Sequence, residues 1–165
     1  KIETGIVKIG DSLEIIGGRD NILTQCMGLE MFRKSLDIAE AGENIGILVK
    51  AVKRDDVRRG FVLSSLNTIK AYDILKGKIY VLTKKEGGRH KPFITNYTPQ
   101  FFLRTANVTG SIILPDDISA VMPGDSLVIT IKLVDKIAAL VGDRFVMREG
   151  NITIGAGIIL EFLSK

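Results

Sequence analysis

Short runs of alternating apolar and polar residues recur along the chain, separated by turn residues, and β-branched side chains dominate the runs. This alternation is typical of strands in half-buried sheets. It predicts strands over Gly5–Ile9, Leu13–Ile16, Ile22–Gly28, Ile45–Val52, Phe61–Ser64, Lys78–Leu82, Phe101–Thr105, Val108–Leu114, Leu127–Leu133, Phe145–Arg148, Ile152–Ile154 and Gly157–Leu163.

One segment has helical spacing instead. Leu29, Phe32, Leu36 and Ala39 follow at three- and four-residue steps, which predicts a helix over Glu30–Glu40. A single helix among many short strands indicates an all-β protein, and the absence of long helical connections favours barrels or sandwiches over a parallel sheet.

The chain divides near Leu66 and Asn67, where a predicted strand ends and the charge balance changes. We therefore expect two consecutive small antiparallel β-barrels, residues 1–66 and residues 67–165, with Asn67–Asp73 as a connector. The first module is small for a closed barrel.

Composition adds limits to this picture. Hydrophobic residues make up 45% of the chain, which is enough for a folded core, and no apolar run approaches the about 20 residues that span a bilayer. The first residues lack the layout of a signal peptide, and without an initiating Met they suggest a cut or processed end. The single cysteine, Cys26, is interpreted as a small buried hydrophobe in a reducing compartment.

Positive charge is concentrated in the second module. Residues 1–66 hold ten Lys/Arg and ten Asp/Glu, whereas residues 67–165 hold thirteen and nine, so the whole excess of +4 lies there. Basic and aromatic residues alternate from Lys84 to Arg104 around a Gly87-Gly88 turn, which we expect to project Arg89 and His90 outward. Such a loop either faces water or contacts phosphate.

No arrangement of residues supports catalysis in this chain. The tetrapeptide Gly-Asp-Ser-Leu occurs at residues 10–13 and 124–127, but a serine nucleophile needs a histidine base, and the only histidine is His90 in the basic loop. Both copies are interpreted as turns that begin strands. No phosphate-binding G-x-x-x-x-G-K-[ST] loop and no cluster with metal-ligand spacing occurs.

Longer motifs resemble a known family. EGGRHKPFITNYTPQFFLRTANVTG (residues 86–110), VMPGDSL (residues 121–127) and DRFVMREGNITIGAG (residues 143–157) resemble the third domain of the elongation factor Tu family. GIVKIGDSLEIIG, GLEMFRKSLDIAEAGENIG and KRDDVRRGFVL in the first module resemble its second domain. The resemblance is collinear over nearly the whole chain.

The resemblance implies two barrels of a GTP-dependent factor that carries aminoacyl-tRNA to the ribosomal A site. It implies that the nucleotide-binding domain, with GTP and Mg²⁺, and the opening strands of the second domain lie outside this sequence, so no cofactor is expected here. The implied partners are aminoacyl-tRNA, the ribosome and the exchange factor elongation factor Ts, without a membrane. The implied state is a monomer in the bacterial cytoplasm or in a mitochondrial or plastid matrix.

The family's tRNA contacts fall on separate parts of this chain. The resemblance implies that Arg59 meets the 5′ phosphate and that Glu30, with Arg33 near it, lies against the terminal adenosine. Arg104 and the Tyr97–Gln100 turn bear charged and polar groups on otherwise apolar strands, which makes them candidates for the surface that docks the nucleotide-binding domain. The positions implied to grip the T-stem backbone are Arg89, Gln100, Thr109 and Gly150.

Some positions depart from the family pattern. Asp135 stands where relatives carry a basic residue, so Lys136 is a possible substitute contact, while Thr98 replaces Arg and Asn107 replaces Asp. The loss of positive charge at Asp135 and Thr98 supports an alternative hypothesis. In it, the barrels serve as a protein–protein interaction module without tRNA binding.

Overall fold

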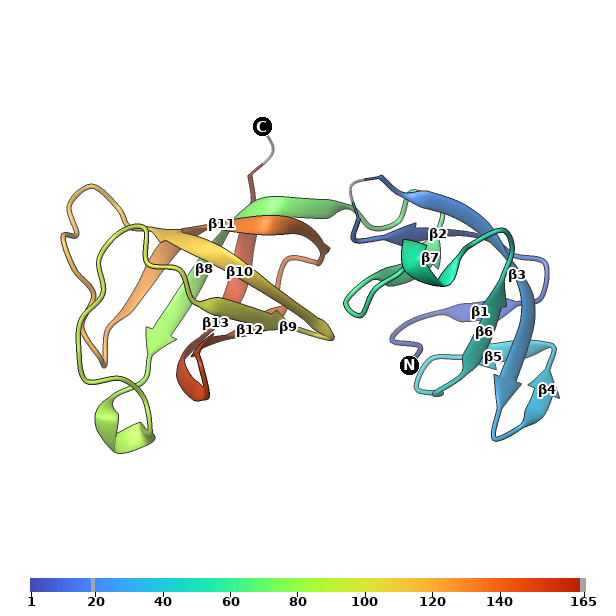
Figure 1. Ribbon diagram of the computed structural model, residues 1–165, viewed down its shortest axis with the longest axis horizontal. Coiled ribbons are helices and arrows are strands. Elements are labelled where there is room, and N and C mark those ends of the chain that lie inside the picture. The colour runs from blue at the N-terminus through green and yellow to red at the C-terminus, as the bar shows by residue number, and fades with distance from the viewer. Residues whose placement is uncertain (19, 164–165) are drawn as a thin grey trace.

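The computed structural model describes residues 1–18 and 20–163, which form two β modules side by side (Figure 1). The all-β prediction is confirmed. The strands are β1 Ile6–Lys8, β2 Ser12–Ile16, β3 Ile22–Met31, β4 Lys34–Leu36, β5 Ile38–Glu40, β6 Gly46–Val49, β7 Val62–Ser65, β8 Ala71–Val81, β9 Gln100–Leu103, β10 Ala106–Ile113, β11 Ser126–Ala138, β12 Arg144–Glu149 and β13 Ile152–Phe162, with 3-10 turns η1 Arg54–Asp56 and η2 Lys84–Glu86.

The second module is a closed antiparallel barrel with strand order β10-β11-β8-β13-β12-β9. Every second residue of these strands points into the barrel, so alternation in the sequence becomes an apolar core. Ile79, Ile131 and Ile159 are at most 1% exposed there, and the rings of Phe101 and Phe145 meet at a centroid distance of 5.8 Å. This core holds the outer residues of each strand in a fixed register.

The first module is an open partial barrel. Its main sheet has the order β4-β3-β2-β7 with β6 also paired to β3, while β1 and β5 form a separate two-stranded ribbon. The buried cluster is small, containing Leu13, Cys26, Leu29 and Ala39. Cys26 is fully buried, as predicted, and burial raises the pKa of its thiol.

The predicted helix over Glu30–Glu40 is wrong. The segment instead forms the end of β3, the strands β4 and β5, and a two-residue hairpin turn between Met31 and Lys34, which are paired. The turn residues Phe32 and Arg33 have φ of 51° and 64°, the pattern of a type I′ turn that matches the twist of paired strands. Phe32 is 90% exposed, so its helical spacing does not mark a buried face.

The connector and one strand break also differ from prediction. Strand β8 begins at Ala71, so the last three residues of the predicted connector Asn67–Asp73 belong to the barrel. The two strands predicted over Ile152–Ile154 and Gly157–Leu163 are one strand, β13. Pairing with β8 and β12 continues through Gly155 and Gly157, residues that are uncommon within strands.

Both Gly-Asp-Ser-Leu segments form turns, as predicted. Gly10 and Gly124 have φ of 95° and 101°, a conformation that favours glycine. In each turn the aspartate accepts a backbone hydrogen bond from three residues earlier, Lys8 N to Asp11 Oδ2 at 2.8 Å and Met122 N to Asp125 Oδ2 at 2.7 Å. The motif therefore has a structural role at both sites.

The modules meet at the turn between β9 and β10. Gly60, in the loop before β7, lies so close to Ala106 that a Cβ on it would be 2.8 Å from the Ala106 Cα. Arg104, in the β9–β10 turn, contacts Glu3 of the first module and Asp143 of the second, each at 3.0 Å. Figure 1 shows this hairpin pointing toward the first module.

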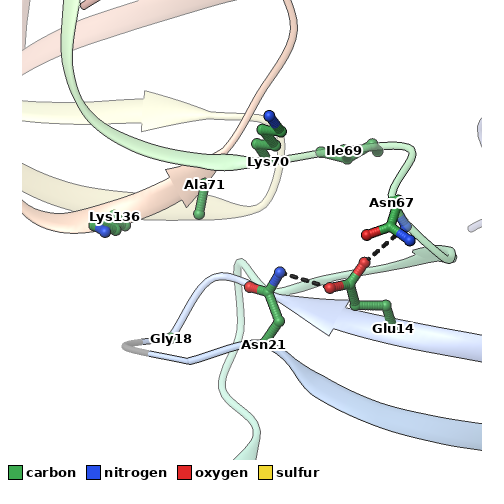
Figure 2. Close-up of a pocket in the computed structure, with 8 residues that line it drawn as sticks. All are labelled: Glu14, Gly18, Asn21, Asn67, Ile69, Lys70, Ala71 and Lys136. Carbon is green, nitrogen blue, oxygen red and sulfur yellow. Dashed lines mark hydrogen bonds between the residues drawn. The ribbon is translucent and has the colours of Figure 1, made fainter. Parts of the chain in front are cut away.

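A cleft of about 320 Å³ lies at the same junction, where the connector leaves the first module. Glu14, only 7% exposed, accepts hydrogen bonds from Asn21 Nδ2 at 2.6 Å and from Asn67 N at 3.1 Å. Figure 2 shows Lys70 and Lys136 across the cleft from these groups. Glu14 thus ties the start of the connector to β2.

Candidate nucleic-acid interface

A row of polar side chains crosses the outer face of three neighbouring barrel strands. Thr109 on β10 pairs with Gln100 on β9, and Gln100 pairs with Arg148 on β12. Their neighbours along each strand, Val108, Phe101 and Met147, are buried, so the row itself faces outward. Neighbouring strands lie about 4.8 Å apart, and the row therefore spans roughly 10 Å.

Gly150 lies at one end of this row. It directly follows β12 and, with Asn151, forms the turn between the paired residues Glu149 and Ile152. Its φ of 56° is positive while that of Asn151 is not, which is the pattern of a type II′ hairpin turn. The structure thus brings together Gln100, Thr109 and Gly150.

Arg148 completes the row, and the sequence analysis did not identify it. Its Nη2 donates to Asn151 O at 3.0 Å, and its guanidinium lies 5.6 Å from the centre of the Phe102 ring. Its Nε is buried and has no hydrogen-bond partner within the described residues. The signal available in the sequence was its position two residues before Gly150, on the face opposite Met147.

Arg89 lies inward, contrary to the expectation that the Gly87-Gly88 turn projects it outward. Its Nε donates to Lys91 O at 2.7 Å and its Nη2 to Pro92 O at 3.4 Å, so it closes its own loop. Its Nη1 lies 3.4 Å from Glu149 Oε2, and only 15% of the side chain is exposed. His90, by contrast, is exposed as expected.

Two aromatic rings hold Arg89 in this position. Its Cζ lies 4.6 Å from the centre of the Tyr97 ring and 5.7 Å from that of Phe93, and these two rings stack at 5.0 Å. Cations over aromatic faces are stabilised by about 0.5–2 kcal/mol. Burial, with a smaller contribution from Glu149, raises the pKa of Tyr97 to about 12.

The raised pKa of Tyr97 predicts a loss of stability at high pH. Because the unfolded chain would lose this proton first, near pH 10, the contribution is complete below that pH and is lost as pH rises toward 12. It amounts to roughly 3 kcal/mol, since the shift is about two pKa units and one unit corresponds to about 1.4 kcal/mol. Tyrosinate absorbance should show a last titration step that Tyr97→Phe removes; an unchanged titration would contradict the assignment.

Arg59 is exposed in the loop before β7, next to Gly60 and therefore beside the start of β10. Thr109 lies three residues further along the same strand from Ala106, about 10 Å at 3.3 Å per residue. Arg104, in the turn just before Ala106, forms ion pairs with both modules and therefore lies between them. The junction thus places Arg59 near the strand that carries Thr109.

The remaining predicted residues lie elsewhere. Glu30 is exposed on β3, paired with Ser35 and Gly46, and Arg33 is exposed at the tip of the neighbouring hairpin. Lys136 lies where the β11–β8 register shifts and lines the junction cleft. Within the part of the chain described, no hydrogen bond or ion pair connects Glu30, Arg33 or Lys136 to the row on the second barrel.

The described residues contain no group of three or more His, Cys, Asp or Glu side chains that could hold a metal ion. Among them, no helix is long and apolar enough to cross a membrane.

A partial barrel followed by a closed six-stranded barrel defines a tandem β-barrel protein. Residues 1–64 match the family model described as elongation factor Tu domain 2, and residues 68–163 match that of the elongation factor Tu C-terminal domain. The chain belongs to the elongation factor Tu family of translation elongation factors. This confirms the resemblance noted in the sequence.

Proposed function

We propose that this chain provides the aminoacyl-tRNA-binding barrels of a GTP-dependent factor that delivers aminoacyl-tRNA to the ribosomal A site. The observation that carries the proposal is the outward row of Thr109, Gln100 and Arg148 ending at Gly150. Hydroxyl, amide, guanidinium and backbone N–H donors in one line suit the regularly spaced phosphates and 2′-hydroxyls of an A-form helix. Membership of the family supports the same reading.

In this proposal the row holds the T-stem, while Arg59 contacts the 5′ phosphate and Glu30 with Arg33 lies against the 3′-terminal adenosine. Such contacts recognise backbone shape rather than sequence, as a carrier of many tRNAs requires. GTP and Mg²⁺ would bind to a separate nucleotide domain, and the ribosome and elongation factor Ts would be further partners. The proposed location is the bacterial cytoplasm or an organellar matrix.

A second candidate function is a protein–protein interaction module. It is favoured by Asp135, an exposed carboxylate on the same bulge as Lys136, which would repel a nearby phosphate. In this case the second barrel would not bind tRNA, and the outer row would contact a protein.

Filter binding of aminoacylated and uncharged tRNA to the complete protein separates the two functions. We expect tighter binding of aminoacyl-tRNA, and a loss of about tenfold for Arg59→Ala, since a phosphate contact contributes about 1–2 kcal/mol. Lys78→Gln is the charge-matched control, because Lys78 is exposed on β8, three strands around the barrel from β9. Equal affinity for both tRNAs, or equal losses in both variants, would contradict the proposal.

A further inference from the structure

The two arginines beside Gly150 have different environments. Two nitrogens of Arg89 donate hydrogen bonds to carbonyl groups of its own loop. Its guanidinium also lies against the rings of Tyr97 and Phe93 and forms an ion pair with Glu149. Arg148 makes one hydrogen bond, to Asn151 O, and lies in the outward row. A guanidinium has five N–H donors, so Arg148 keeps more of its donors for a ligand.

We propose that Arg148 is the arginine that contacts an RNA phosphate, and that Arg89 is a positioning residue that holds the Gly150 turn through Glu149. The proposal deepens the proposed function and rests on it. The sequence alone suggests the opposite roles, because Arg89 lies in the more basic segment.

The geometry supports this division of roles. Glu149 and Ile152 are the paired residues that flank the turn, so a fixed Glu149 limits how Gly150 and its N–H are oriented. Arg89 reaches Glu149 from the loop between β8 and β9, which is a separate element from the β12–β13 hairpin. Arg148 holds the same turn from within the hairpin, at Asn151 O. The turn is thus fixed from two sides.

The outer nitrogen of Arg148, Nη1, indicates where a ligand would act. Within the described residues Nη1 makes no hydrogen bond and is not buried, whereas Arg148 Nε and Arg89 Nη1 are both buried without a hydrogen-bond partner and cannot reach a ligand. Gln100, its cross-strand neighbour, is exposed and can donate to the same anion. A phosphate bridging Arg148 and Gln100 would use donors that the fold leaves without protein acceptors.

The salt dependence of tRNA binding distinguishes the two roles. Removing one phosphate contact lowers the slope of log K against log salt by about 1, whereas removing a positioning residue lowers affinity and leaves the slope unchanged. With the complete protein, we expect Arg148→Gln to weaken binding about tenfold and to reduce the slope. Arg89→Gln should weaken binding several-fold with the wild-type slope.

A double-mutant cycle tests whether Arg89 acts through Glu149. If it does, Arg89→Gln combined with Glu149→Gln weakens binding no more than either single variant, because both break the same link. Additive losses, or a slope reduced by Arg89→Gln as much as by Arg148→Gln, would overturn the proposal. Lys78→Gln, on the strand opposite β9 in the barrel, serves again as the charge control. It should bind tRNA with the same constant as the unmodified protein.

Amide hydrogen exchange keeps the positioning role testable without RNA. Arg89→Gln should accelerate exchange of the Glu149 and Ile152 amides, which pair across the turn, at least tenfold, while Val108 on β10, separated from β12 by β9, stays protected. Unchanged exchange at the turn would overturn the positioning role. If the unmodified protein binds no tRNA, the proposed function and the role of Arg148 both fail, and exchange alone decides the role of Arg89.

Discussion

Gly157→Ala is expected to destabilise the second barrel by about 3 kcal/mol, the upper part of the range for overpacked cores. A Cβ at this position would lie 2.5 Å from Phe145 Cζ and 2.7 Å from Lys78 O. The ring is in the core and the carbonyl belongs to the neighbouring strand, so neither can move without loss of packing or pairing. Urea denaturation followed by circular dichroism measures the change.

Gly28→Ala is the matched control for this prediction. It makes the same chemical change within strand β3, but the nearest atom to the new Cβ, Leu48 Cβ, is 3.7 Å away, an ordinary contact distance. Its stability should stay within about 0.5 kcal/mol of the unmodified protein. If both variants lose the same stability, the cost arises from the glycine backbone and not from the Phe145 contact.

The same contact explains why the sequence predicted two strands where the structure has one. Glycine is uncommon in strands, and the predicted strands Ile152–Ile154 and Gly157–Leu163 leave out Gly155 and Ala156 between them. In the closed barrel, Gly157 and Gly77 both adjoin the Phe145 ring, which fills the space that side chains would occupy. This requirement arises between β8 and the β12–β13 hairpin, which are far apart in sequence, and no local pattern contains it.

The segment after Leu29 shows a different limit. Apolar residues at three- and four-residue steps fit a helix, and no Asn-Gly or Asp-Gly signal marks the tight turn at Phe32 and Arg33. Pairing of β3 with β4 and with β6 overrides the local spacing. Most other strands were predicted correctly because one face of each is buried and alternation survives in the sequence.

The sequence predicted which residues belong to the candidate site better than it predicted how they are arranged. Motif resemblance identified Gln100, Thr109 and Gly150, but their common row depends on strand register, which only the folded barrel defines. Arg89 was expected to face outward because a glycine pair precedes it. Its actual position depends on Tyr97, further along the same loop, and on Glu149 at the end of β12. The sequence shows which donors are present, and tertiary contacts determine which can reach a ligand.

Glu14→Ala is expected to destabilise the first module by about 2 kcal/mol, because hydrogen bonds to charged groups contribute about 1.5–3 kcal/mol. The substitution removes the acceptor of Asn21 Nδ2 and of the Asn67 backbone N–H. Asn67 has a φ of 58° at the start of the connector, so this bond helps to keep an uncommon backbone conformation. The orientation of the second barrel relative to the first should therefore become more variable, which residual dipolar couplings of the two modules measure.

Glu14→Gln separates hydrogen bonding from charge in this prediction. The glutamine oxygen can accept from the Asn67 N–H, and its amide can donate to Asn21 once the Asn21 side chain turns its oxygen toward it. Both bonds then persist in neutral form, so the variant should lose less than half the stability lost by Glu14→Ala and keep the inter-module orientation. If Glu14→Gln is as damaging as Glu14→Ala, the negative charge of Glu14 in the cleft that Lys70 and Lys136 also line, and not the hydrogen bond to the connector, is what orients the modules.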